Sequence, residues 1–81
     1  MARQEVILPK WGLTMEDGSV VAWHVSVGDE VTEGQVIADV ETEKVENELL
    51  SPCDGTVLEL VAEEEEIVDV GGVLAIIESR D

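Results

Sequence analysis

The sequence predicts an all-β protein, a flattened barrel or sandwich, and three observations support that class. Its apolar residues form short runs rich in valine and isoleucine, turn-forming residues separate the runs at near-regular intervals, and the chain contains an internal repeat. Short β-branched runs bounded by Gly, Asp and Pro are typical of strands joined by tight turns. The runs lie at residues 6–8, 20–23, 36–38, 49–50, 57–61 and 73–77.

The internal repeat appears when the sequence is shifted by 37 positions, which superimposes residues 17–41 on residues 54–78. Eight of the twenty-five aligned pairs are identical. Each copy has an Asp-Gly turn, a strand, an acidic turn, a Val-x-x-Gly segment and a second strand. Neither copy is long enough to bury both faces of its own sheet, so we expect the two to pack face to face with pseudo-two-fold symmetry.

The strand after each Asp-Gly turn contains large apolar side chains. Because side chains alternate between the two faces of a strand, we expect Val21 and Trp23 to point toward the core in the first copy. The same alternation places Leu58 and Leu60 inside in the second copy. His24 then faces solvent.

One turn of the second copy, at residues 63–66, leads to two expectations. The acidic run at residues 63–66 is too short to nucleate a helix by itself, and we expect a solvated turn there. Glu65 aligns with Gly28, and a position that takes glycine is often one with positive φ. A glutamate in that conformation costs roughly 1 kcal/mol, so we expect the second turn to be looser than the first.

Length and charge limit the possible functions. With 81 residues the chain predicts a single domain, residues 1–81. Its 20 acidic and 4 basic residues give a net charge of −16, which repels nucleic acid and anionic membranes and favours a neutral or basic partner. Cys53 is a single cysteine, and neither a signal peptide nor a membrane-length apolar run is seen. We expect a monomeric, cytoplasmic domain without catalytic or metal-ligating motifs.

The segment between the two copies predicts a hairpin. Two extended stretches, residues 39–42 and 45–49, meet at Glu43 and Lys44. The absence of an Asn-Gly or Gly-x pair favours a type I turn with these two residues at its centre. Lys44 is then exposed at the tip, where most lysines only improve solubility, and spacing alone does not assign it a function.

Several motifs occur in a characteristic order and spacing: residues 7–18, 27–31, 33–34, 41–45, 51–55 and 70–71. Together they resemble the lipoyl domain of 2-oxo acid dehydrogenase and acetoin dehydrogenase complexes. The resemblance implies the hammerhead fold of lipoyl and biotinyl domains, a flattened barrel of two four-stranded antiparallel sheets. It also implies that lipoate is attached to Lys44 through an amide bond, and that Glu43 and Val45 present the lysine.

By the same resemblance the domain is a carrier within, or a partner of, a dihydrolipoamide acyltransferase. The lipoyl arm would shuttle between a thiamine-diphosphate-dependent dehydrogenase component, the acyltransferase core and dihydrolipoamide dehydrogenase, and the domain itself would not be catalytic. One loop would help the dehydrogenase component recognise its carrier, with Trp11 and Met15 exposed. The residues of that loop are Lys10, Trp11, Leu13, Thr14 and Met15. Alternatively, Trp11 covers the end of the barrel.

Attachment of lipoate requires an enzyme, because nearby anions favour the charged ammonium form of Lys44. The acidic residues concerned are Glu41, Glu43, Glu46 and Glu48. We therefore expect a lipoate ligase or lipoyl transferase among the partners. Two alternatives remain open: a biotin carrier domain, whose target lysine usually lies between methionines, and an unmodified interaction module with the same fold. The sequence is compatible with either an excised domain or a free-standing carrier.

Overall fold

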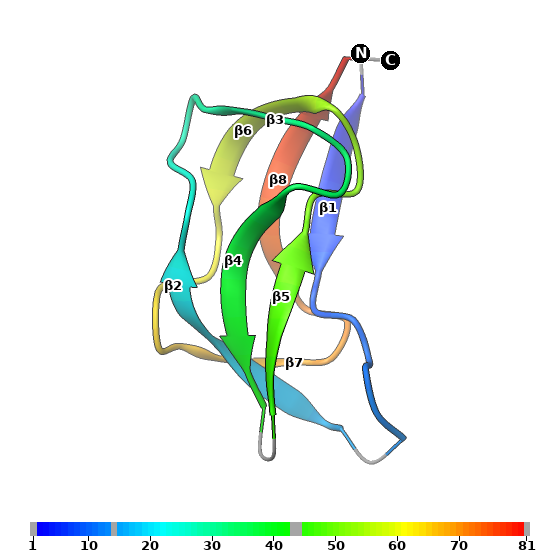
Figure 1. Cartoon of the computed structure of the whole chain (residues 1–81), viewed down its shortest axis with the longest axis vertical. Helices are drawn as coiled ribbons and strands as arrows, with labels where there is room; N and C mark the ends of the chain where they lie inside the picture. The colour runs from blue at the N-terminus through cyan, green and yellow to red at the C-terminus, as the bar shows by residue number, and fades with distance from the viewer. Residues whose placement is uncertain (1, 14, 43–44, 81) are drawn as a thin grey trace.

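A computed structural model describes residues 2–13, 15–42 and 45–80, and these form two four-stranded sheets (Figure 1). The strands are β1 (Arg3–Ile7), β2 (Asp17–Trp23), β3 (Glu30–Val31), β4 (Val36–Glu41), β5 (Glu46–Leu50), β6 (Gly55–Leu60), β7 (Ile67–Asp69) and β8 (Val73–Ser79). The strand orders are β1-β8-β6-β3 and β5-β4-β2-β7, and all paired strands are antiparallel. The described residues contain no helix long and apolar enough to cross a membrane. The predicted all-β class with two four-stranded sheets is confirmed.

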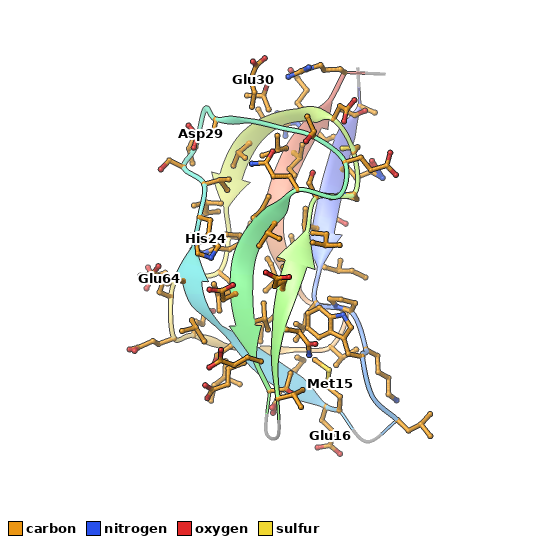
Figure 2. The ribbon with its side chains drawn as sticks, viewed as in Figure 1. Met15, Glu16, His24, Asp29, Glu30 and Glu64 are labelled. Carbon is orange, nitrogen blue, oxygen red and sulfur yellow. The ribbon has the colours of Figure 1, made fainter. Side chains whose placement is uncertain are left out.

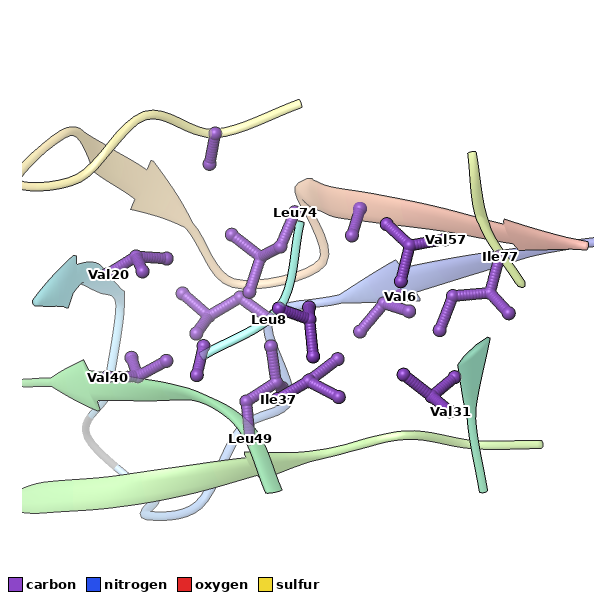
Figure 3. Close-up of a cluster of buried hydrophobic side chains, with 14 of the residues drawn as sticks. Val6, Leu8, Val20, Val31, Ile37, Val40, Leu49, Val57, Leu74 and Ile77 are labelled. Atoms are coloured by element: carbon purple, nitrogen blue, oxygen red, sulfur yellow. The ribbon is translucent and has the colours of Figure 1, made fainter. Parts of the chain in front are cut away.

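The hydrophobic core fills the space between the two sheets (Figure 3). It consists mainly of aliphatic side chains that alternate along the strands, as expected where each sheet buries one face. The largest fully buried side chains are Leu8, Ile37, Leu74, Ile77, Val20, Val31, Val40 and Val57. Trp23 is partly buried and packs against this cluster, which agrees with its predicted core position.

The prediction for Val21 is wrong, because β2 contains a bulge. Val20 is 0% exposed whereas Val21 is 42% exposed. The pairing of β2 with β4 shifts by one residue between Val20 and Ala22. Such a shift exchanges the two faces of a strand, so Val20 and Trp23 share the inner face although an odd number of positions separates them.

The second copy has the same bulge in β6, between Val57 and Glu59. Val57 is buried and Leu60 packs against the core, whereas Leu58 is only partly buried and lies outside the core cluster. The inward position predicted for Leu60 is confirmed and that for Leu58 is wrong. Val57 lies 37 residues after Val20, so the two copies of the repeat have the bulge at equivalent positions.

The acidic run is a solvated turn, as predicted, since the side chains of Glu63–Glu66 are exposed. Its geometry matches that of the corresponding turn in the first copy. Glu65 has φ of 69° and Gly28 has φ of 95°. The Gly28 N–H donates to the Val57 carbonyl at 2.8 Å, and the Glu65 N–H donates to the Val20 carbonyl at 2.6 Å. Each turn thus bonds to the equivalent strand of the other copy, and the expected loosening at Glu65 is wrong.

Glu65→Gly should therefore stabilise the protein by about 0.5 to 1 kcal/mol. Removing the left-handed penalty of a residue with a Cβ gains about 1 to 2 kcal/mol, and the added flexibility of glycine in the unfolded chain takes back part of it. Urea denaturation of the two proteins measures the difference. The matched control is Gly28→Ala, which should lose about 1 kcal/mol. A destabilised Glu65→Gly protein would show that the carboxylate side chain stabilises the turn in another way.

The β4–β5 hairpin lies at one end of the long axis of the molecule. Figure 1 shows the C-terminal end of β4 and the N-terminal end of β5 at the bottom of the view, and the N-terminal end of β1 and the C-terminal end of β8 at the top. The molecule measures 35 × 21 × 17 Å along its principal axes. The fold therefore directs the hairpin away from the ends of the chain.

Candidate functional site

The hairpin is built on strands that the core holds in place. The pairing of β4 with β5 runs from Val36 opposite Leu50 to Glu41 opposite Glu46. Along it the buried side chains of Ile37, Val40 and Leu49 enter the core. Because these side chains are close-packed, the base of the hairpin has little freedom to move.

Two hydrogen bonds close the hairpin beyond the last strand pair. The Thr42 N–H donates to the Val45 carbonyl at 2.9 Å, and Thr42 Oγ1 donates to the same oxygen at 3.2 Å. This pairing leaves a loop of two residues, Glu43 and Lys44, as the sequence predicts. Both lie outside the described residues, so the type I turn stays a prediction. Val45 is 55% exposed.

Carboxylates cover the outer face of the hairpin. Glu41 pairs with Glu46 and Asp39 pairs with Glu48, so like charges lie directly opposite each other on neighbouring strands. Such pairs destabilise a sheet by a few tenths of a kcal/mol or more. His24 Nε2 lies 3.0 Å from a carboxylate oxygen of Asp39 and is exposed, as predicted (Figure 2). The lysine hairpin is thus strongly acidic on its outer face.

Asn47 is a residue of the hairpin that none of the sequence motifs identifies. It lies on the inner face of β5 opposite Val40, and its Nδ2 is buried without a hydrogen-bond partner among the described residues. A buried unpaired amide costs about 1 to 3 kcal/mol. The sequence did contain a sign of this buried polar residue. Asn47 lies two positions before the apolar Leu49, so alternation along the strand places both side chains on the inner face.

The loop between β1 and β2 folds back on itself at the hairpin end of the barrel. The Trp11 N–H donates to Met15 Sδ at 3.4 Å, and the Met15 N–H donates to the Gly12 carbonyl at 3.2 Å. Met15 packs against the core and lies near the hairpin end (Figure 2). The expectation that Met15 is exposed is wrong, because its thioether closes this turn.

The other loop residues differ in exposure. Leu13 is 95% exposed and Lys10 is exposed, whereas Trp11 is 39% exposed. Thr14 lies outside the described residues. That this loop contributes to partner recognition remains a prediction. The exposed side chains of Leu13 and Lys10 are accessible to a partner.

Trp11 also forms one wall of an open groove of about 290 Å³. The groove lies between β1 and β5, which are edge strands of the two different sheets. Its lining is mostly apolar, and the carboxylate residue Glu48 of the hairpin contributes to it. The site therefore combines a closed two-residue hairpin with an adjacent apolar groove.

The fold and hairpin can be compared with known proteins. A family described as "Biotin-requiring enzyme", the biotin and lipoyl family, matches residues 4–77. The chain is 43% identical over 76 residues to the dihydrolipoyllysine-residue acetyltransferase component of the pyruvate dehydrogenase complex of Corynebacterium glutamicum, covering 94% of this chain and 11% of that protein. It is 40% identical over 70 residues to the corresponding component of the acetoin cleaving system of Pseudomonas putida, covering 86% and 19%.

A solved structure is also similar: the lipoyl domain of the 2-oxoglutarate dehydrogenase complex of Azotobacter vinelandii. It superimposes with a TM-score of 0.74 at 33% identity, over 93% of this chain and 96% of that domain. The chain belongs to the biotin and lipoyl attachment family. Its likeness to the Azotobacter domain over nearly all of both chains confirms the predicted resemblance to a lipoyl domain. The chain spans less than a fifth of the length of the two acetyltransferase components.

Proposed function

We propose that this domain carries lipoate on Lys44 and functions as a swinging-arm carrier of acyl groups and reducing equivalents. The observation that carries the proposal is the hairpin closed by Thr42 and Val45, which leaves a two-residue loop containing the lysine at the end of the barrel. The likeness to a lipoyl domain supports lipoate as the attached group. The flanking residues Glu41, Val45 and Glu46 are exposed, which fits a group attached at this loop.

The protein contributes position and orientation to the chemistry. When attached, lipoate supplies a disulfide for acyl transfer and electron transfer, and we propose that partner enzymes supply the catalysis. The paired strands β4 and β5 fix the backbone on both sides of the loop, so a partner meets the arm at a defined place. Fixing the backbone in this way lowers the entropy lost when a partner binds.

The proposed partners are a thiamine-diphosphate-dependent dehydrogenase component, an acyltransferase core, dihydrolipoamide dehydrogenase, and a lipoate ligase or lipoyl transferase. Their binding entrances should be positively charged, because the domain has a net charge of −16 and an acidic hairpin face. Opposite charges steer encounter and raise association rates, an effect that salt reduces. The cytoplasm remains the proposed location.

Coexpression with a lipoate ligase, with lipoate in the medium, tests the assignment. The wild-type protein should gain the mass of one lipoyl group, and Lys44→Arg should gain none, because arginine offers no acylable amine. Lys10→Arg is the matched control and should be modified fully. Lipoylation of Lys44→Arg would place the attachment elsewhere, and modification by a biotin ligase in place of the lipoate ligase would identify a biotin carrier. Intact-mass spectrometry distinguishes these results.

A further inference from the structure

The groove between β1 and β5 is an apolar feature that the proposed carrier function leaves without a role. Its walls include Ile7 from β1, Leu50 from β5, and Trp11, Pro9 and Pro52 from the adjoining loops. Ile7 and Leu50 are about half exposed. Exposed apolar side chains grouped around a hollow often mark a binding site.

The size and charge of the groove limit what fits it. Its volume of about 290 Å³ lies at the lower end of the range for small-molecule sites. Glu5 and Glu48 also contribute to its lining, and their carboxylates repel an anionic occupant. The groove therefore suits a small, uncharged, apolar group. A dithiolane ring attached through an amide has these properties, whereas free lipoate has a carboxylate.

The groove is within reach of Lys44. Glu48 lies four residues after Lys44, so their Cα atoms are at most about 14 Å apart whatever the shape of the turn. The lysine side chain and the acyl chain of lipoate together have about as many bonds as four residues of backbone, and they extend about 13 Å by the same geometry. The dithiolane ring lies beyond these bonds and adds to this length, so the whole arm spans the largest separation that the chain allows, and its ring reaches the end of the groove that Glu48 lines.

We propose that the dithiolane of lipoyl-Lys44 rests in the β1–β5 groove against Trp11 when no partner enzyme holds it. This inference rests on the proposed lipoylation of Lys44. Sulfur packs favourably against aromatic rings, and the apolar walls remove the ring from water. Each contact is weak, so the arm leaves the groove readily when a partner binds. The resting position shields the disulfide and keeps the arm on one side of the hairpin.

Nuclear magnetic resonance of the lipoylated domain tests the resting position directly. The indole signals of Trp11 should shift on lipoylation and show contacts to the ring protons of the arm. The signals of Trp23 should not shift. Trp23 does not line the groove, and its Nε1–H donates a hydrogen bond of 2.9 Å to the Ala62 carbonyl. A domain acylated with octanoate serves as a second probe, since it has an arm of the same length without the dithiolane and should shift Trp11 less.

The rate of disulfide reduction by a water-soluble phosphine gives an independent readout. Trp11→Ala should raise this rate about two- to threefold, and Leu50→Ser, at an exposed position of the other wall, should raise it as well. Leu13→Ala is the matched control: it alters an exposed residue of the same loop that does not line the groove, and the rate should not change.

Intact mass separates failure of this inference from failure of the carrier function. A protein that gains no lipoyl group contradicts the proposed function itself. Full lipoylation, with Trp11 signals identical to those of the unmodified domain and equal reduction rates in wild type and Trp11→Ala, overturns the groove proposal alone. A Trp11 shift that disappears on dilution would assign the groove to a second copy of the chain and would also overturn it.

Discussion

Gly55→Ala is expected to destabilise the domain by about 3 kcal/mol or more. A Cβ at Gly55 would lie directly against the Glu78 carbonyl oxygen and 2.8 Å from Ile77 Cγ2, closer than real Cβ contacts allow. Gly55 pairs with Ser79 where β6 meets β8, so relief requires the two strands to separate. Overpacking of this kind typically costs 1 to 3 kcal/mol and occasionally more, and here the obstacle is backbone. For 81 residues, total stability is about 4 to 12 kcal/mol.

The internal repeat supplies the control for this experiment. Gly18 is the equivalent of Gly55 in the first copy, and a Cβ there would lie 3.2 Å from the Glu41 carbonyl oxygen and 3.3 Å from Thr42 Cγ2. A shift of a few tenths of an ångström relieves these contacts, so Gly18→Ala should cost about 1 kcal/mol. Gly12→Ala meets no atom within 4 Å and should be nearly neutral. Urea denaturation that gives equal midpoints for Gly55→Ala and Gly18→Ala would contradict the steric explanation.

The internal repeat made the architecture predictable, whereas the bulges in β2 and β6 made the assignment of inward-facing side chains partly wrong. Two copies offset by 37 residues indicated two packed halves, and the structure has two four-stranded sheets. Alternation then assigned Val21 to the core in place of Val20, because an extra residue in a strand leaves no mark in the pattern of apolar residues. The same error recurs at Leu58, as it must when both copies share the bulge.

The two shortest strands could not be located from local sequence, although the resemblance to a fold of two four-stranded sheets implied them. β3 has two residues and β7 has three, fewer than an alternating pattern needs to show itself. Val31 in β3 and Val68 in β7 are one of the eight identical pairs of the repeat, and that match is the only feature of the sequence that marks these strands. β3 is defined by its pairing with β6, and β7 by its pairing with β2. The partners are distant in the sequence, so the local sequence does not indicate the pairing.

The two parts of the candidate site, the β4–β5 hairpin and the β1–β5 groove, also differ in how far the sequence predicts them. The hairpin is local, and the loop between Thr42 and Val45 was predicted at the residues where the closing hydrogen bonds occur. The groove depends on topology, because β1 and β5 are brought together by the packing of two sheets. Trp11 and Leu50 lie 39 positions apart in the sequence, and no motif connects them.

Ile37→Ala and Leu74→Ala should each destabilise the domain by about 3 to 4 kcal/mol. Ile37 in β4 is 0% exposed and Leu74 in β8 is 1% exposed, and the two occupy equivalent positions of the repeat. Truncation of a buried Ile or Leu to Ala costs 2 to 5 kcal/mol, since it removes apolar contacts and leaves a cavity. Ile67→Ala is the control, because Ile67 is 71% exposed and its replacement should change stability by no more than about 0.5 kcal/mol.

These two variants also test whether the halves of the barrel contribute equally to stability and to the lysine hairpin. Ile37 is part of the hairpin strand β4, whereas Leu74 is part of β8 in the other sheet. Because both side chains enter one shared core, the two losses measured by urea denaturation should agree within about 1 kcal/mol. Lipoylation of the folded fraction should be equal in both variants, since neither side chain is exposed at the hairpin surface. A much larger loss for Ile37→Ala, with reduced modification of folded protein, would show that the hairpin depends on its own sheet alone.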